Sequence, residues 1–178
     1  MSPVEFKNIC DIINLQINNG EPAMKKLYSC KNYKYYTMLR QILYDLKLTD
    51  KDYLWLISDI EAYPHKEEYQ NLIENNYLIL STKELLDMLD DDDFQWIWAV
   101  FSAIPSTYTK EEILSFDLPY IQNIEIGKYN PHADVPKFQH PYSDFELYAV
   151  DSSYIFLITD NNELINQFKK SYPSYTEE

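Results

Sequence analysis

The stretch DFQWIWAVFSAIP, residues 93–105, decides how the rest of this sequence is interpreted. Between Phe94 and Ile104, only Gln95 and Ser102 carry clearly polar side chains. A short apolar run that is rich in aromatic and β-branched residues and ends at a proline is typical of a strand buried on both faces. The run is too short to cross a membrane. The sequence therefore predicts a central strand here, with the remaining chain packed around it.

Alternation along this strand predicts what lies on each of its faces, because successive strand residues point to opposite sides of a sheet. The small residues Ala99 and Ala103 fall on one face, together with Gln95, Ile97 and Phe101. The other face carries larger side chains and is therefore expected to lie under the helices; its residues are Phe94, Trp96, Trp98, Val100, Ser102 and Ile104.

A second stretch, DYLWLISDIEAYP at residues 52–64, resembles the first position by position. Trp55 matches Trp96, and Ala62 matches Ala103. Internal duplication is one explanation. Two neighbouring core strands that answer the same packing demands are another, and we favour this second explanation. Either way, residues 52–64 are expected to form a strand beside the central one.

The flanking sequence predicts helices. Ser2 and Pro3 begin an amphipathic segment that Gly20 ends, and a second segment has apolar residues at helical spacing, so we expect helices at residues 4–19 and 35–46. Residues 1–50 are thus a mainly helical N-terminal part, with a helical turn at residues 23–28 as one option. The motifs STKE and TKEE are capping boxes, which predict helices that start after Ser81 and Thr109.

The remaining pattern completes one α+β domain over residues 1–178, with a mixed, largely antiparallel sheet and packed helices. Further helices are expected at residues 67–75, 111–116 and 163–172, and further strands at residues 77–80, 121–126, 144–149 and 153–159. Residues 172–178 should form a frayed acidic tail.

Charge is the strongest compositional signal. The net charge is −14, from 29 acidic and 15 basic residues, and Arg40 is the only arginine. Such a chain repels nucleic acid and anionic membranes and attracts basic proteins. A charged surface that merely keeps the protein in solution explains the charge equally well. The chain also contains 17 tyrosines, which offer rigid, amphipathic contact area at protein interfaces or serve as core aromatics.

No motif in the sequence indicates a reaction. Two glycines are too few for a phosphate-binding loop, and Cys10 and Cys30 do not form a metal-ligand spacing or a disulfide framework. A triad can be drawn from His140, Asp151 and Ser152 or Ser153, but such a grouping depends on geometry. We expect a non-catalytic protein that needs no cofactor or metal. The N-terminus lacks a signal-peptide pattern, so we expect the protein to be cytoplasmic.

Two segments are candidates for binding a partner. Four aspartates in succession oppose the dipole at a helix C-terminus, so they are expected to unwind the helix into a charged turn. Residues 127–141 contain three prolines and form the longest irregular stretch, and functional loops are drawn from such segments. The candidate partner-binding residues are therefore Asp90, Asp91, Asp92, Asp93, Tyr129, His132 and Tyr142.

The segments WIWAVFSAIP, TKEEILSFDLPY, PKFQHPYSDFELYAVDSSYIFLITDNNEL and FKKSYP resemble small bacterial proteins of domain-of-unknown-function families, several of which are similar to immunity proteins of polymorphic toxin systems. The resemblance covers residues 94–173 and lies in core strands. It implies a bacterial cytoplasmic protein of the immunity type. From the net charge we expect its cognate toxin domain to be basic, and we expect no direct contact with nucleic acid or membrane. The alternatives are a nucleic-acid-mimicking inhibitor of the phage type and a small enzyme with a site near His140 and Asp151.

Overall fold

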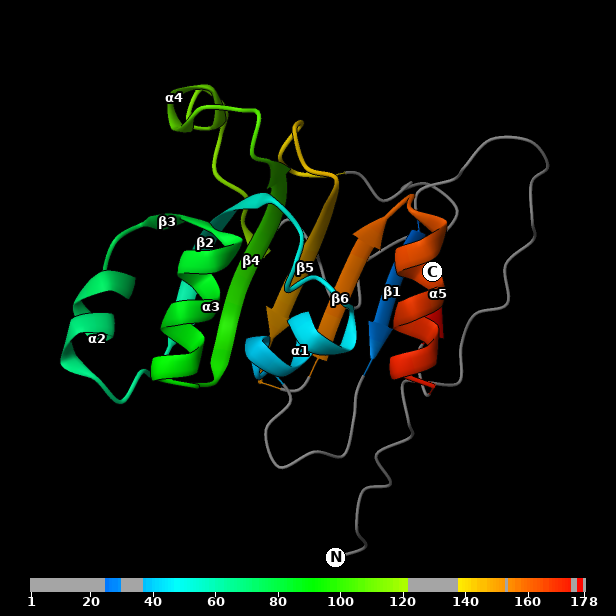
Figure 1. The fold of residues 1–178 in the computed structure, drawn as a ribbon, viewed down its shortest axis with the longest axis horizontal. Helices are drawn as coiled ribbons and strands as arrows, with labels where there is room; N and C mark the ends of the chain where they lie inside the picture. The colour runs from blue at the N-terminus through cyan, green and yellow to red at the C-terminus, as the bar shows by residue number, and fades with distance from the viewer. Residues whose placement is uncertain (1–24, 30–36, 122–137, 153, 174–175, 178) are drawn as a thin grey trace, which may run out of the picture.

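The computed structural model describes residues 25–29, 37–121, 138–152, 154–173 and 176–177 (Figure 1). They form a sheet of seven strands in the order β3-β2-β4-β5-β6-β1-β7, and every neighbouring pair is antiparallel. The strands are β1 (Lys25–Ser29), β2 (Tyr53–Ala62), β3 (Tyr77–Ser81), β4 (Trp96–Pro105), β5 (Phe145–Val150), β6 (Tyr154–Thr159) and β7 (Thr176–Glu177). The predicted α+β class is confirmed, and β4 is an interior strand as expected.

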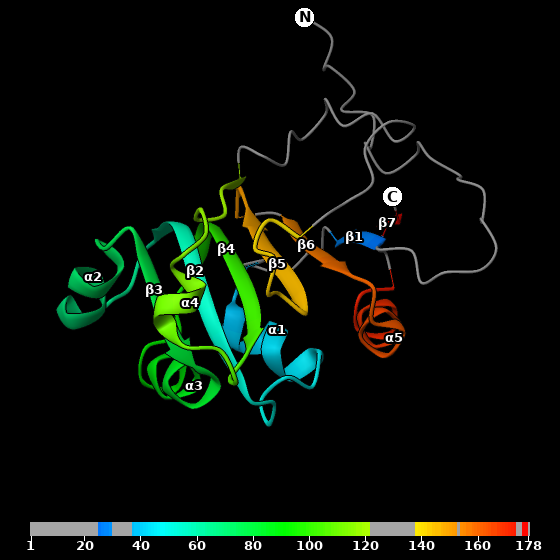
Figure 2. The same cartoon turned by 90° about the horizontal axis from the view of Figure 1, so that it is seen from above.

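Five helices accompany the sheet in the part of the chain that the structure describes. They are α1 (Leu39–Asp45), α2 (Glu67–Ile73), α3 (Thr82–Asp91), α4 (Lys110–Ile113) and α5 (Asn162–Ser171). Helices α1, α3 and α5 lie on one side of the sheet, as the view from above shows (Figure 2). Helix α4 packs through Ile113 against Leu56 and Ile104, on the opposite side.

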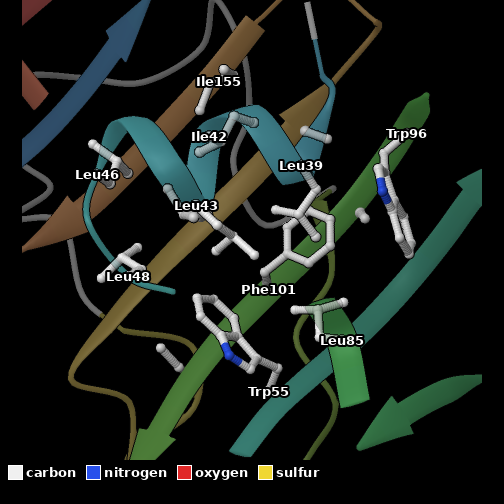
Figure 3. Packing of buried hydrophobic residues seen from close by; sticks show 14 of the residues in the cluster. Leu39, Ile42, Leu43, Leu46, Leu48, Trp55, Leu85, Trp96, Phe101 and Ile155 are labelled. Atoms are coloured by element: carbon white, nitrogen blue, oxygen red, sulfur yellow. The ribbon is translucent and has the colours of Figure 1, made fainter. Parts of the chain in front are cut away.

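The main core lies between the sheet and these three helices. Leu39 and Leu43 of α1 gather with Leu85 of α3 around Trp55 and Phe101 (Figure 3). All five side chains are almost fully buried. Burial of large apolar side chains is the dominant favourable term in folding, so this layer holds the domain together.

The predicted assignment of the two faces of β4 is wrong. The helices cover the face of Ala99, Phe101 and Ala103, whereas Val100 packs with residues of β5 and β6 on the opposite side. Small alanines on the helix side let α1 and α3 approach the sheet closely. This close packing decides which face the helices cover, not the size of the side chains on the other face.

Trp96 nevertheless lies on the helix side, because the ladder between β2 and β4 is irregular. Ser58 pairs with Val100, Glu61 with Trp98, and Ala62 with Trp96, so the register shifts twice. An extra residue in one strand moves the following side chains to the other face. Trp96 and Trp98 therefore belong to different clusters, although simple alternation places them together.

Other predictions differ from the structure or lie outside the described residues. Within the tail predicted to be frayed, residues 176–177 form strand β7 beside β1. Residues 25–29 form strand β1 beside β6, not a helical turn, because Leu27 is paired with Leu157 across the sheet. Helix α3 continues through Asp90 and Asp91 and does not unwind before the aspartates. The predicted helix at residues 4–19, and the strand at 121–126 beyond Ile121, lie outside the described residues.

Both capping boxes are confirmed. The side chain of Ser81 accepts the backbone N–H of Glu84, while the Glu84 carboxylate accepts the Ser81 backbone N–H at 2.8 Å. Thr109 and Glu112 repeat this exchange at the start of α4. The backbone hydrogen bond from Ser81 and the one from its hydroxyl lower the pKa of Glu84.

Candidate functional site

The acidic run at the end of α3 is largely engaged with the protein itself. Asp90 forms an ion pair with Arg40 at 2.5 Å. Asp91 pairs with Lys66 at 2.5 Å and accepts the hydroxyl of Tyr69 at 2.9 Å. These contacts offset the unfavourable helix dipole, which explains why the helix does not unwind.

Asp92 has a structural position. Its side chain is only 4% exposed, and it accepts the backbone N–H groups of His65 at 2.8 Å and Lys66 at 2.9 Å. Nδ1 of His65 lies 2.7 Å from its other oxygen. Burial pushes the pKa of Asp92 upward, but these hydrogen bonds outweigh it, and the pKa is lowered. Asp92 thus caps α2, while Asp93 is exposed in the turn before β4.

Tyr142 lies elsewhere, in an aromatic cluster on the sheet face away from α1, α3 and α5. Its ring stacks on Tyr108 with centroids 4.0 Å apart and meets the edge of Phe116 at 5.0 Å. The structure therefore does not bring Tyr142 together with the aspartates of α3. The other two candidates, Tyr129 and His132, lie outside the described residues.

The grouping of His140 with Asp151 and Ser152 is contradicted, while Ser153, the alternative serine, lies outside the described residues. His140 is fully buried, and its Nε2 lies 3.0 Å from the carbonyl oxygen of Ile113. Its Nδ1 accepts the backbone N–H of Tyr142 at 3.2 Å, so both ring nitrogens are engaged. Asp151 is exposed in the turn after β5, whereas His140 precedes that strand. Strand β5 separates the two side chains, so they cannot act on one substrate.

A buried carboxylate, which the sequence did not reveal, fixes the loop before β5. Glu146 is inaccessible, and its Oε1 accepts the backbone N–H of His140 at 2.8 Å. Its Oε2 accepts the backbone N–H of Gln139 at 3.0 Å and the hydroxyl of Tyr148 at 2.5 Å. The hydroxyls of Ser102 and Ser143 also donate to Oε1. Burial, and then the Glu146 charge, raises the pKa of Tyr148 far above its ordinary value.

The site that combines acidic charge with exposed tyrosine is a groove of about 570 Å³ beside the second half of β2. Three carboxylates line it, those of Asp59, Glu61 and Glu74, and none of its described lining residues is Lys, Arg or His. Tyr63 is 67% exposed and Tyr120 is 48% exposed. The other residues that line the groove are Ile60, Ala62, Pro64, Gln70, Ile73, Asn75 and Asn76.

One wall of the groove is held by hydrogen bonds that cross from β2 to residues 119–121. Asp59 has a positive φ of 52°, and its carboxylate accepts the backbone N–H of Ile121 at 2.9 Å. Ser58 donates its hydroxyl to the carbonyl oxygen of Pro119 at 2.7 Å. Gln139 accepts the backbone N–H of Tyr120 and donates to its carbonyl oxygen, both at 2.9 Å. The backbone at Tyr120 is therefore fixed at the rim.

A smaller cavity of about 270 Å³ lies between the start of β2 and α5. It is lined by Lys47 and Lys51 as well as by Asp50 and Glu163. Positive and negative side chains are mixed in this cavity, whereas the charged side chains that line the groove beside β2 are all negative.

Comparison with protein-family models, with curated proteins and with solved structures found no match to this chain. The resemblance to immunity proteins therefore stays a prediction. Within the described segments, no helix has the length and apolar character needed to cross a bilayer. Those segments also contain no group of three or more His, Cys, Asp or Glu side chains that could hold a metal ion.

Proposed function

We propose that this chain is a non-catalytic, acidic immunity protein that binds and neutralises a cognate basic toxin domain in the bacterial cytoplasm. The observation that carries the proposal is the groove beside β2, where Asp59, Glu61 and Glu74 meet two exposed tyrosines and no described lining residue is a cation. The net charge of −14 supports a basic partner.

The charges and the rings would contribute differently to binding. Carboxylates on the rim attract a basic partner over long range and raise the association rate, and this contribution weakens as salt is added. Tyr63 and Tyr120 offer flat, amphipathic faces that an arginine or lysine side chain can cover. Tyrosine loses little side-chain entropy on binding, which suits it to anchor a complex.

A nucleic-acid mimic is supported less well. Mimicry needs unpaired acidic groups in rows that imitate phosphates, whereas Asp90 and Asp91 are paired with Arg40 and Lys66. The carboxylates of the groove line a hollow together with tyrosine and aliphatic side chains. Such a hollow is better suited to receive a segment of a partner protein than to contact the DNA-binding surface of an enzyme.

Co-expression tests the proposal. The chain is produced together with the C-terminal domain of the secreted protein encoded beside it, and growth and co-purification are measured. We expect protection and a stoichiometric complex. The groove variant carries Asp59→Asn, Glu61→Gln and Glu74→Gln, and it should protect less well. The matched variant Asp50→Asn, Glu111→Gln and Glu163→Gln removes the same charge elsewhere and should protect fully. If the unmodified chain gives neither protection nor a complex, the proposed function is wrong.

A further inference from the structure

Strand β2 extends beyond its neighbour β3. Strand β3 pairs with β2 from Leu54 to Ser58, whereas β4 follows β2 to Ala62. On the β3 side, none of the described strands pairs with residues 59–62 of β2. These same four residues line the groove. The groove therefore lies beside this part of β2, between it and Glu74, Asn75 and Asn76, which precede β3.

The hydrogen bonds at both ends of β2 indicate which backbone groups of residues 59–62 face the groove. In an antiparallel strand, the N–H and C=O of one residue point to one neighbouring strand, and those of the next residue point to the other. Tyr53 directs its N–H to Thr82 Oγ1, on the β3 side. Beyond the register shift, Tyr63 donates its N–H to the carbonyl oxygen of Gln95, on the β4 side. Counting back from Tyr63, the backbone groups of Ala62 and Ile60 point toward the groove.

We propose that the groove receives an extended, lysine- or arginine-bearing segment of the partner, which adds as a short strand beside residues 60–62 of β2. The inference rests on the proposed function and names the partner's binding element. The backbone groups of Ile60 and Ala62 supply hydrogen bonds, as in other cases of strand addition. Side chains of alternate partner residues fall on one face of an added strand, so basic residues at every second position meet the carboxylates of the groove.

Charge and backbone geometry together favour an extended segment over a helix. A helix satisfies its backbone groups internally, so it would leave the groove-facing groups of Ile60 and Ala62 without partners. An extended segment pairs with them and still presents its cations to Asp59, Glu61 and Glu74. An acidic segment would meet three like charges, which is unfavourable.

A defined peptide tests this binding mode directly. The alternating peptide acetyl-KVKVKVKV-amide is titrated into the isotopically labelled full chain, and amide chemical shifts and hydrogen exchange are recorded. We expect saturable shifts at residues 59–64 and at Tyr120, and at least ten-fold slower exchange of the Ile60 and Ala62 amides. The acidic counterpart EVEVEVEV should not bind, and the groove variant Asp59→Asn, Glu61→Gln and Glu74→Gln should lose at least ten-fold in affinity for the basic peptide.

Backbone methylation separates strand addition from simple attraction between side chains. Two versions of the basic peptide carry N-methyl groups, one on the odd residues and one on the even residues. An added strand pairs along one edge only, so one methylated version should lose at least ten-fold in affinity while the other binds like the parent peptide.

Three results would overturn the inference: no saturable shifts at the groove, equal binding by both methylated peptides and the parent, or a protein that is already a dimer through this edge in sedimentation. The co-expression experiment is independent of these results. Protection that depends on the groove charges, combined with equal binding of the methylated peptides, would leave the proposed function standing and refute strand addition alone.

Discussion

The carboxylate of Asp92 lies 2.7 Å from Nδ1 of His65 and also accepts the backbone N–H of that residue at 2.8 Å. The N-cap residue of α2, Lys66, makes no cap with its own side chain and instead donates its backbone N–H to Asp92. The C-cap residue of α3 thus satisfies donors at the start of α2, which would otherwise lack partners. Helix α2 forms a wall of the groove through Gln70 and Ile73, so Asp92 supports the candidate binding surface from behind.

The neighbouring aspartates should therefore differ in their contributions to stability. Asp92→Ala removes the acceptor for two backbone donors at a buried position, and we expect the free energy of unfolding to fall by about 2–3 kcal/mol. Asp91→Asn disrupts an exposed ion pair that solvent screens, so it should leave the free energy of unfolding nearly unchanged. Urea unfolding of both variants at neutral pH measures the difference. Equal midpoints would show that Asp92 does not hold α2.

Acid should weaken the same contact. The pKa of Asp92 is lower in the folded chain than in the unfolded chain, where a free aspartate has a pKa of about 3.9. Its contribution to stability is therefore fully present above the unfolded pKa and is lost as the pH falls through the lower, folded value. Asp92→Asn lacks this titration.

Urea unfolding between pH 6 and pH 2 checks this expectation by comparing the parent with Asp92→Asn. The free energy of unfolding of the parent should fall more steeply on the acid side, so that the difference between the two proteins narrows. Glu84 and Glu112, whose pKa values are also lowered, titrate in both proteins and cancel from the comparison. A constant difference across this range would contradict the role of the Asp92 charge.

The two buried tryptophans of β2 and β4 allow a matched test of packing and hydrogen bonding. Trp55 donates its indole N–H to Thr82 at 3.0 Å, while the indole nitrogen of Trp96 has no partner among the described residues. Trp96→Ala should cost about 3–5 kcal/mol, because it opens a cavity beside Phe94 and Phe101.

Replacement by phenylalanine should separate the two positions. Trp55→Phe removes a hydrogen bond and leaves Thr82 with fewer donors, so it should destabilise the chain by about 1 kcal/mol more than Trp96→Phe. Thermal and urea unfolding measure both. If Trp96→Ala were as stable as the parent, β4 would not be an organising strand of this fold.

Local signals in the sequence predicted much of the fold. The capping boxes at Ser81 and Thr109 depend on residues three positions apart, and both helices begin as expected. The apolar runs of β2 and β4 are adjacent strands, and Trp55 faces Ala103 just as Trp96 faces Ala62. At both ends of the ladder, a large ring thus lies opposite a small residue. This packing requirement alone would make the two stretches similar, without any duplication.

Features that depend on distant residues were not predicted. The faces of β4 were not predicted correctly, because the helices approach the side of Ala99 and Ala103, and because the extra residue of β4 at Ile97 depends on pairing with Glu61 and Ala62 of β2. The aspartates of α3 look like a free acidic patch in sequence, but Arg40 and Lys66 reach them from other elements. The groove needs β3 to end before β2 does, and the lengths of two paired strands are not encoded in either one alone.

Glu146 provides the last prediction, because it links the core to the groove. Each of its oxygens faces a backbone N–H, that of His140 on Oε1 and that of Gln139 on Oε2. In Glu146→Gln, an amide NH2 group replaces one of the two oxygens. At either position this group would face a backbone N–H, so two donors would meet without an acceptor. Relief of the buried charge favours the variant, but the unsatisfied donors should outweigh it, with a loss of about 2–4 kcal/mol.

Ser102→Ala is the control for Glu146→Gln, since it removes only one donor, at 3.3 Å, and should cost about 1 kcal/mol. Gln139 carries the effect outward, because its side chain holds the backbone of Tyr120 at the rim of the groove. Glu146→Gln should therefore also weaken binding of the basic partner, whereas Ser102→Ala should leave it unchanged. Urea unfolding and titration calorimetry measure the two effects, and a Glu146→Gln protein with parental stability would show that the carboxylate does not anchor this loop.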